Sequence, residues 1–264
     1  MYARANAAML TSAEIEACIK ASILGEVYTT PKPGLVDRRD SGAHRDMNVY
    51  TFERSAAAIT PYLTKMFFEG YFWKNSLQNL FPKIRKTGIF AEKTMFRATD
   101  QVNTHKGLIF TMGILSACAG QCYAKIRRFD TSKIFAYAEE MTKDALEADF
   151  LEMSQRDPVT HGEILFQKYG ERGIRGEAQK GFPIIRNIAL PLMRQYRGIG
   201  LDENGSNINV LLRIMMELND TNVWSRGSRD DVKWIQEQAE KIWKPGGAFF
   251  ETGMKKIEKL NREC

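Results

Sequence analysis

Apolar residues recur at helical spacing along almost the whole chain, and no stretch alternates between apolar and polar residues as a strand would. The first pattern begins at Thr11, where Thr-Ser-Ala-Glu forms a capping box, and Ile15, Cys18, Ile19 and Ile23 share one helix face. Because half-buried strands need a period of two and these patterns have a period near that of a helix, the sequence predicts an all-α fold.

Further helices are predicted wherever this period persists between polar junctions. They cover residues 51–69, 77–84, 90–98, 106–121, 132–153, 162–169, 184–196, 208–218, 230–243 and 249–261. Pro61 should kink or divide the first of these, since proline removes a backbone donor. No repeat length recurs, which argues against a solenoid. With 264 residues, the chain is expected to form one domain over residues 1–264, a bundle of helices with an active site built from the loops between them.

Residues 29–46, which we call the proline loop, interrupt the helical pattern with two prolines and two glycines. Pro31 and Pro33 restrict the backbone, whereas Gly34 and Gly42 permit turns or the close approach of a ligand. The loop also carries three carboxylates, four cationic side chains, a histidine and an apolar Leu-Val pair that can anchor it. Since a flexible linker would be richer in Ser, Gly, Glu and Lys, this composition favours a ligand-binding loop over a structural crossing.

Four other polar junctions, at residues 103–107, 160–163, 173–183 and 220–227, are similar in residue type. The histidines His44, His105 and His161 all lie in such junctions, and histidine is the side chain that titrates nearest neutral pH. Asn103 and Lys106 surround a helix start and have the form of an anion site, with free backbone N–H groups and a positive helix end. A simple cap with a solvated lysine would leave the same pattern.

Two of these junctions leave a structural and a functional interpretation open. Arg175 and Glu177 are suited to bind a phosphate and a metal ion, but an ion-paired turn would use the same residues. Asp220 and Asn222 are suited to a hard cation, but equally to a turn after a helix. The occurrence of several such junctions in one chain favours a shared site.

The charge and the apolar runs exclude some function classes. The net charge of +6 is spread along the chain among 32 acidic residues, and no dense basic stripe with interleaved aromatics is present, so a phosphorylated substrate is favoured over nucleic acid. Residues Met1–Leu10 lack the apolar stretch of a secretory signal, and the most apolar run, residues 108–119, is too short and interrupted to cross a bilayer. We expect a cytoplasmic protein with no membrane or nucleic-acid partner.

Taken in order, the motifs resemble those of the triphosphoribosyl-dephospho-CoA synthase family over nearly the whole chain. They are Thr30-Pro-Lys-Pro-Gly-Leu-Val-Asp-Arg38, Ser41-Gly-Ala-His44, Asn103-Thr-His-Lys-Gly107, Arg175-Gly-Glu-Ala178 with Gly181-Phe-Pro183, and Asp220-Thr-Asn-Val223 with Arg226-Gly227. The resemblance implies an all-α transferase that moves the 5-triphosphoribosyl group of ATP to the ribose 2′-hydroxyl of 3′-dephospho-CoA and releases adenine, with Mg²⁺. Its product is the prosthetic-group precursor of citrate lyase or malonate decarboxylase.

The resemblance also implies roles for residues. Phosphates of ATP or 3′-dephospho-CoA would be bound by polar and cationic side chains, namely Lys32, Arg38, Asn103, Lys106, Arg175 and Arg226. Mg²⁺ would be held by one or two carboxylates from a set of four, Asp37, Asp46, Glu177 and Asp220. The family's α-linked product from a β-nucleotide requires a base on the face opposite adenine, for which we expect His44 or Asp37, with His105 contacting a phosphate or the leaving group.

Members of the family continue past the equivalents of residues 261–264 into a Ser-Pro-Gly-Gly-Ser-Ala-Asp segment and a final helix, so we expect a catalytic domain without that glycine-rich loop. Two other functions are consistent with the residues: an Mg²⁺-dependent N-glycoside or nucleotide hydrolase on an all-α fold, and a non-catalytic basic helical binding module. Binding of 3′-dephospho-CoA distinguishes them. A homodimer is compatible with the sequence, which does not distinguish citrate lyase from malonate decarboxylase as the enzyme served.

Overall fold

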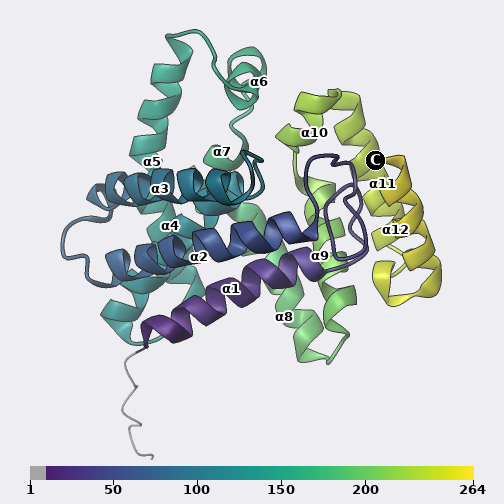
Figure 1. Ribbon diagram of the computed structural model, residues 1–264, viewed down its shortest axis with the longest axis horizontal. Coiled ribbons are helices and arrows are strands. Elements are labelled where there is room, and N and C mark those ends of the chain that lie inside the picture. The colour runs from purple at the N-terminus through teal and green to yellow at the C-terminus, as the bar shows by residue number, and fades with distance from the viewer. Residues whose placement is uncertain (1–9) are drawn as a thin grey trace, which may run out of the picture.

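The computed structural model describes residues 10–264, and this part of the chain folds into twelve α-helices without any strand (Figure 1). The predicted all-α fold is therefore confirmed. The absence of a secretory signal was judged on residues 1–10, which lie outside the described part apart from Leu10. Of the described helices, one, Lys106–Ile126, is long and apolar enough to span a membrane, but half of its most apolar window is buried in the fold, as in a core helix.

The helices follow one another through short loops, except where the proline loop intervenes. The α-helices are α1 (Ser12–Tyr28), α2 (Val49–Tyr71), α3 (Phe81–Ala98), α4 (Lys106–Ile126), α5 (Thr131–Ser154), α6 (His161–Tyr169), α7 (Gly173–Gln179), α8 (Leu190–Gly198), α9 (Glu203–Glu217), α10 (Thr221–Arg226), α11 (Arg229–Trp243) and α12 (Glu251–Glu263). Single turns of 3-10 helix form η1 (Leu77–Asn79) and η3 (Gly247–Phe249), and a π-helical turn forms η2 (Ile185–Ala189).

Some elements differ from the sequence prediction. Helix α3 is one continuous helix rather than two, because Pro82 lies in its first turn, where the missing N–H costs nothing. Pro61 does not divide α2, which packs along α1, α3 and α4 and is held by those contacts. The junctions at 173–183 and 220–227 contain α7 and α10, which are too short to show an apolar period.

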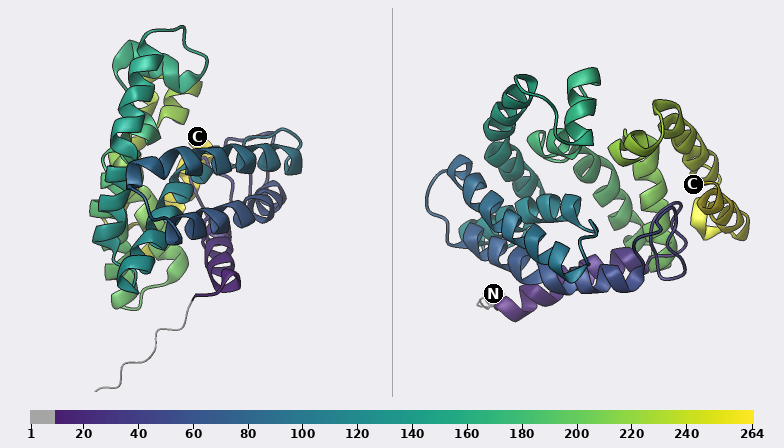
Figure 2. Two further views of the ribbon diagram at one scale, coloured as in Figure 1. Left: turned by 90° about the vertical axis from the view of Figure 1, so that its left-hand side faces the viewer. Right: turned by 45° about the horizontal axis from the view of Figure 1, so that its top comes forward.

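The buried apolar side chains form one large core and two smaller clusters. The large core lies among α1 to α5 and α7 and includes Leu63, Met66, Ile114 and Leu146. A second cluster joins α9, α11 and α12, which lie toward the green-to-yellow end of the chain in Figure 2. The third cluster consists of Val27, Val36 and Met47 and lies under the proline loop, so that the valine of the predicted Leu-Val anchor is buried.

Helices α2 and α4 pack backbone against backbone. A Cβ atom on Gly70 of α2 would lie 1.9 Å from a carbonyl oxygen of α4, and a Cβ on Gly120 of α4 would lie 1.9 Å from a carbonyl oxygen of α2. Only glycine permits this approach. The helices run side by side in the same direction, since Ser55 near the start of α2 contacts His105, directly before α4. The start of α4 is thereby held close to the start of α2 and to the proline loop.

Candidate functional site

The carboxylate of Asp37 holds the proline loop in shape. It is 1% exposed. Its Oδ2 accepts hydrogen bonds from the Thr30 hydroxyl and the Lys32 backbone N–H, both at 2.9 Å, and its Oδ1 accepts from the N–H groups of Arg39 at 2.6 Å and Asp40 at 3.1 Å. Four donors occupy the acceptor sites of two oxygens. Asp37 therefore organises the loop in this conformation, and its role as base or metal ligand stays a prediction.

Two further features fix the loop. Gly34 and Gly42 have positive φ angles, and a Cβ on Gly42 would lie 2.5 Å from the carbonyl carbon of Gly34. On one side, the Asn204 side chain of α9 both donates to and accepts from the backbone of Thr30, at 2.7 and 2.9 Å. On the other side, Asn261 of α12 accepts from the Gly34 N–H at 2.8 Å. The loop is thus ordered without being helical, because side chains of α9 and α12, which come much later in the sequence, bind its backbone.

His105 is a buried neutral histidine with a defined tautomer. It is 3% exposed, and its Nδ1 lies 2.6 Å from the Ser55 hydroxyl oxygen, which also accepts a hydrogen bond from the Thr104 hydroxyl at 2.7 Å. The single Ser55 proton therefore goes to Nδ1, and the imidazole proton sits on Nε2. Burial, with the charge of Lys32, lowers the pKa of His105 to about 4. Nε2 has no hydrogen-bond partner within residues 10–264, so it is a free donor.

His44 lies in the second half of the proline loop and is partly buried. Burial and the positive charge of Arg226, which ends α10, lower the pKa of His44, while the Asp46 carboxylate opposes this effect. The His44 Nδ1 and the Asp46 Oδ1 are 3.9 Å apart. His44 is therefore neutral at pH 7 and able to accept a proton, and the fold places two motifs that are far apart in the sequence, His44 and Arg226, in one electrostatic environment.

The cations of the proline loop have different environments. Lys32 is buried, and its Nζ donates to the backbone oxygen of Glu26 at 2.9 Å and to the Glu26 carboxylate, so it ties the loop to the end of α1. Arg38 is exposed and makes no ion pair with the described residues. Of the two, Arg38 is the side chain that is free to contact a phosphate in this conformation, whereas Lys32 contributes a buried charge beside His105.

The start of α4 has features of both interpretations made from the sequence, an anion site and a helix start with a solvated lysine. The Asn103 side chain lies two residues before the N-cap residue His105 and accepts a hydrogen bond from the Lys106 N–H at 3.3 Å, so it satisfies one free N–H of the first turn. The Lys106 side chain is 53% exposed and lies 3.5 Å from the Glu92 carboxylate of α3. A weak, exposed pair of this kind leaves Lys106 able to turn toward a ligand.

The carboxylates predicted to bind Mg²⁺ do not form a cluster. Glu177 accepts from the Ile184 N–H at 3.1 Å, and Asp220 caps α10 by accepting from the N–H of Asn222 at 2.8 Å. Across residues 10–264, no group of three or more His, Cys, Asp or Glu side chains is arranged to hold a metal ion. Asp46 is the exposed carboxylate of the predicted set.

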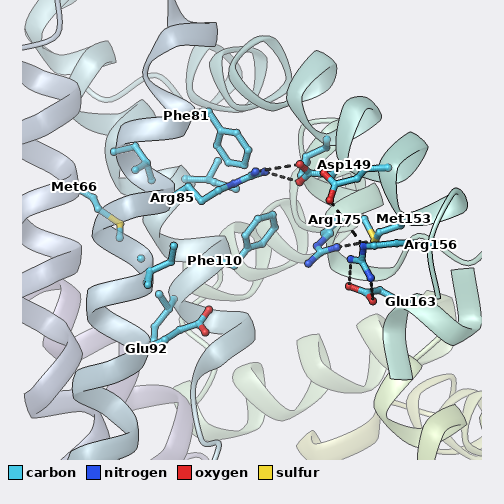
Figure 3. Close-up of a pocket in the computed structure, with 17 residues that line it drawn as sticks. Met66, Phe81, Arg85, Glu92, Phe110, Asp149, Met153, Arg156, Glu163 and Arg175 are labelled. Carbon is cyan, nitrogen blue, oxygen red and sulfur yellow. Dashed lines mark hydrogen bonds and ion pairs between the residues drawn. The ribbon is translucent and has the colours of Figure 1, made fainter. Parts of the chain in front are cut away.

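A pocket of about 350 Å³ opens among α3 to α7, with α2 at its base (Figure 3). Its interior is apolar and its rim is charged. The apolar residues are Met66, Phe81, Ile84, Ile89, Ile109, Phe110, Ile114, Leu146 and Met153, and the charged ones are Arg85, Glu92, Asp149, Glu152, Arg156, Glu163 and Arg175. We call it the arginine pocket. In this pocket Arg175 of α7 faces α4, the helix that begins directly after His105.

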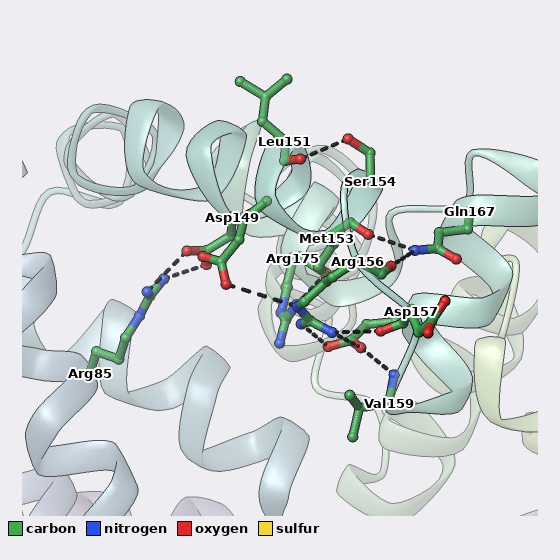
Figure 4. Close-up of polar contacts among 12 residues, drawn as sticks. Arg85, Asp149, Leu151, Met153, Ser154, Arg156, Asp157, Val159, Gln167 and Arg175 are labelled. Atoms are coloured by element: carbon green, nitrogen blue, oxygen red, sulfur yellow. Dashed lines mark hydrogen bonds and ion pairs between the residues drawn. The ribbon is translucent and has the colours of Figure 1, made fainter.

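Two of its three arginines are neutralised by carboxylates (Figure 4). Arg85 of α3 binds Asp149 of α5 through both of its terminal nitrogens, the longer contact being 3.0 Å. Arg156 binds Glu163 through two contacts of 3.0 Å, and these bonds, with the Val159 N–H, lower the pKa of Glu163 to about 2. Within the described residues Arg175 has no carboxylate partner, and its side chain donates one hydrogen bond, to the Met153 sulfur at 3.1 Å.

Several site residues carry no motif and were not predicted from the sequence. Arg85 lies on the charged face of an ordinary amphipathic pattern, and Arg156 lies in the loop after α5; in both places, ion pairs with solvent-exposed residues are the usual interpretation. Ser55 offered a usable signal, because it is a polar residue on the face of α2 that also carries the apolar Ile59 and Leu63, and a buried hydroxyl needs a partner.

These features, neutral histidines near cationic side chains and a pocket with an apolar interior, are those expected of a helical enzyme that acts on an anionic, partly apolar substrate. Residues 12–264 match the family model described as ATP:dephospho-CoA triphosphoribosyl transferase. The chain belongs to this family.

Curated relatives cover nearly the whole chain. A protein of Salmonella typhimurium named "Probable 2-(5′′-triphosphoribosyl)-3′-dephosphocoenzyme-A synthase 1" is 35% identical over 258 residues, which are 96% of this chain and 84% of the relative. A protein of Escherichia fergusonii named 2-(5′′-triphosphoribosyl)-3′-dephosphocoenzyme-A synthase is 33% identical over 256 residues, which are 97% of this chain and 84% of the relative. No solved structure matches the chain.

Proposed function

We propose that this protein transfers the 5-triphosphoribosyl group of ATP to the ribose 2′-hydroxyl of 3′-dephospho-CoA and releases adenine. The observation that carries the proposal is the family match over residues 12–264, and the relatives' names agree with it. The geometry is consistent with it, because three family motifs lie close together. Lys32 of the proline loop lowers the pKa of His105 at the start of α4, and Arg226 of α10 lowers the pKa of His44 in the loop. Neither the hydrolase nor the non-catalytic alternative is favoured by these findings.

The reaction needs a base. As the 2′-hydroxyl attacks C1′ of the ATP ribose and the bond to adenine breaks, the hydroxyl proton must be removed. His44 is our candidate, because it is neutral at pH 7 and keeps part of its side chain exposed. Asp37 is the weaker candidate, because its two oxygens already accept four hydrogen bonds.

His105 has a different role. Its pKa of about 4 keeps it neutral, and its tautomer presents Nε2–H as a hydrogen-bond donor. Leaving a buried donor without an acceptor costs about 1–3 kcal/mol. A substrate acceptor, either a ring nitrogen of the departing adenine or a phosphate oxygen, would remove this cost. Ser55 and Thr104, on the other side of the imidazole ring, hold the ring in the orientation that presents this donor.

Charge on the triphosphate requires cations. Arg38 and Arg226 are exposed, and Lys106 is held only by a weak pair, so these three are the proposed phosphate contacts. Mg²⁺ would arrive with ATP and neutralise phosphate charge, and Mg²⁺ needs only one or two protein carboxylates. Asp46, which is exposed, fits this requirement best. We further propose a cytoplasmic location and a product used as prosthetic-group precursor by citrate lyase or malonate decarboxylase.

The direct test is incubation of the purified protein with ATP, Mg²⁺ and 3′-dephospho-CoA, followed by chromatography. We expect free adenine and a triphosphoribosylated product in equal amounts, both dependent on 3′-dephospho-CoA. Adenine released equally without 3′-dephospho-CoA would favour the hydrolase. ADP or AMP in place of adenine would contradict glycosyl transfer altogether.

A further inference from the structure

The charges of the arginine pocket are nearly balanced, which limits what it can bind. Arg85 pairs with Asp149, Arg156 with Glu163, and Glu92 with Lys106 at the pocket edge. A polyphosphate brings several negative charges, and these carboxylates would repel it. The part of a ligand that enters must therefore be mostly uncharged, while the unpaired Arg175 can donate to a polar atom of that part.

The interior supplies the matching apolar surface. Phe110 comes from the first turns of α4 and Phe81 from the start of α3, and the Arg85 guanidinium covers the Phe81 ring at 4.7 Å from its centroid. In Figure 3, Phe110 of α4 and Arg175 of α7 both line the pocket. A flat, polarisable ring with donors and acceptors on its edge suits an aromatic surface beside a guanidinium. The volume of about 350 Å³ lies within the usual range of ligand pockets.

The position of the pocket links it to the phosphate contacts. Ile109 and Phe110 line the pocket one turn after His105, and Lys106 lies at its Glu92 edge. A nucleotide whose base occupies the pocket would therefore direct its ribose and phosphates toward the start of α4. This is the arrangement that an adenine nucleotide requires, and both substrates of the proposed reaction carry adenosine.

We propose that the arginine pocket binds the adenosine part of one of the two nucleotide substrates, with the purine against Phe110 and its edge hydrogen-bonded to Arg175. This inference rests on the proposed function for the identity of the nucleotides. The donor ATP and the acceptor 3′-dephospho-CoA share this chemistry, and the experiment separates them. The pantetheine arm of the acceptor, which is also uncharged, is the competing occupant.

The test uses steady-state adenine release by the wild type and by two variants, Arg175→Gln and Phe110→Leu, with Arg97→Gln as the matched control. Arg97 is exposed in the last turn of α3 and does not line the pocket. Adenosine is used as a reversible inhibitor, and pantetheine as the competing probe. Melting temperatures show whether each variant remains folded.

We expect adenosine to compete with one nucleotide. Arg175→Gln should raise the KM of that nucleotide and the inhibition constant of adenosine about tenfold or more, the loss of one bond to a charged group. Phe110→Leu should raise both about threefold to tenfold, the loss of an aromatic contact. An effect on ATP alone assigns the pocket to the donor, and an effect on 3′-dephospho-CoA alone assigns it to the acceptor.

Unchanged KM values for both nucleotides in a folded, active Arg175→Gln variant would overturn the proposal. So would inhibition by pantetheine that depends on Arg175 while adenosine inhibition does not. If the wild type itself releases no adenine, the proposed function fails. Equilibrium binding of adenosine to the wild type and to Arg175→Gln then tests the pocket separately. Equal affinities would overturn the pocket proposal, and a tenfold weaker affinity of the variant would support it.

Discussion

The proline loop and the arginine pocket both place charged side chains at a site, but by different means. The loop is shaped by backbone hydrogen bonds to one buried carboxylate, that of Asp37, and by side chains of α9 and α12. The pocket is a gap among helices whose rim is made of paired side chains such as Arg156 and Glu163. The loop depends on its internal bonds for its shape, whereas the pocket depends on helices that are stable without it. Substitution of Asp37, which shapes the loop, should therefore alter folding and turnover together, whereas substitutions in the pocket should alter mainly binding, with little effect on stability.

The largest effect is expected for Asp37→Asn. An amide cannot accept from four donors, so at least two of the four donors lose their acceptor, and the free energy of unfolding should fall by about 3–5 kcal/mol. Turnover should fall with it, because the loop that carries His44 loses its shape. Denaturant unfolding measures the first effect, and Asp46→Asn, an exposed carboxylate of the same loop, is the control. An Asp37→Asn protein of wild-type stability would contradict the structural role of this carboxylate.

His105 should make the protein less stable in acid. Its pKa is lowered to about 4 in the folded state, whereas an unfolded histidine titrates near 6.5. Between these values the unfolded chain binds a proton that the folded protein does not, so stability is lost as the pH falls from about 6.5 to 4, by about 3 kcal/mol in total. Urea unfolding at several pH values should show this slope reduced in His105→Gln. His161→Gln, at an exposed position, should retain it; equal slopes in all three proteins would show that His105 is not buried as described.

A smaller effect is expected in the pocket for Glu163→Gln. The Arg156 pair lies at the protein surface on its arginine side, so the free energy of unfolding at pH 7 should fall by only about 1 kcal/mol. Because the pKa of Glu163 is lowered to about 2, the stabilisation by this pair is present above pH 4.5 and is lost as the pH falls toward 2. The kcat should not change. A loss as large as that of Asp37→Asn would remove the contrast between the two regions.

The smallest effect is expected for Arg226→Gln. Removing this positive charge should raise the pKa of His44, so the acid side of the pH profile of kcat should move to higher pH. Arg229→Gln, three residues further along at the start of α11, is the control. An unchanged profile would mean either that Arg226 does not act on His44 or that His44 does not limit turnover in acid.

The sequence predicted those features that depend on neighbouring residues along the chain. Apolar periodicity predicted most helices, and the unusual composition of the proline loop marked it as a candidate site. The sequence did not show that the Asp37 oxygens accept four hydrogen bonds from the loop itself. The motif contains the carboxylate and its donors, but the sequence does not show that the loop folds so that these donors surround the carboxylate. It also did not reveal the pairing of Arg85 with Asp149, since this pocket depends on how α3 packs against α5 rather than on any local pattern.

The most direct test of the account is the turnover of His44→Gln with saturating ATP, Mg²⁺ and 3′-dephospho-CoA. If the proline loop carries the base while the pocket carries binding, adenine release should fall at least about 100-fold, with unchanged melting temperature and unchanged KM values. Arg175→Gln should show the converse, a raised KM with kcat retained. Adenine release by a folded His44→Gln protein within twofold of the wild-type rate would contradict the assignment of the chemistry to the loop.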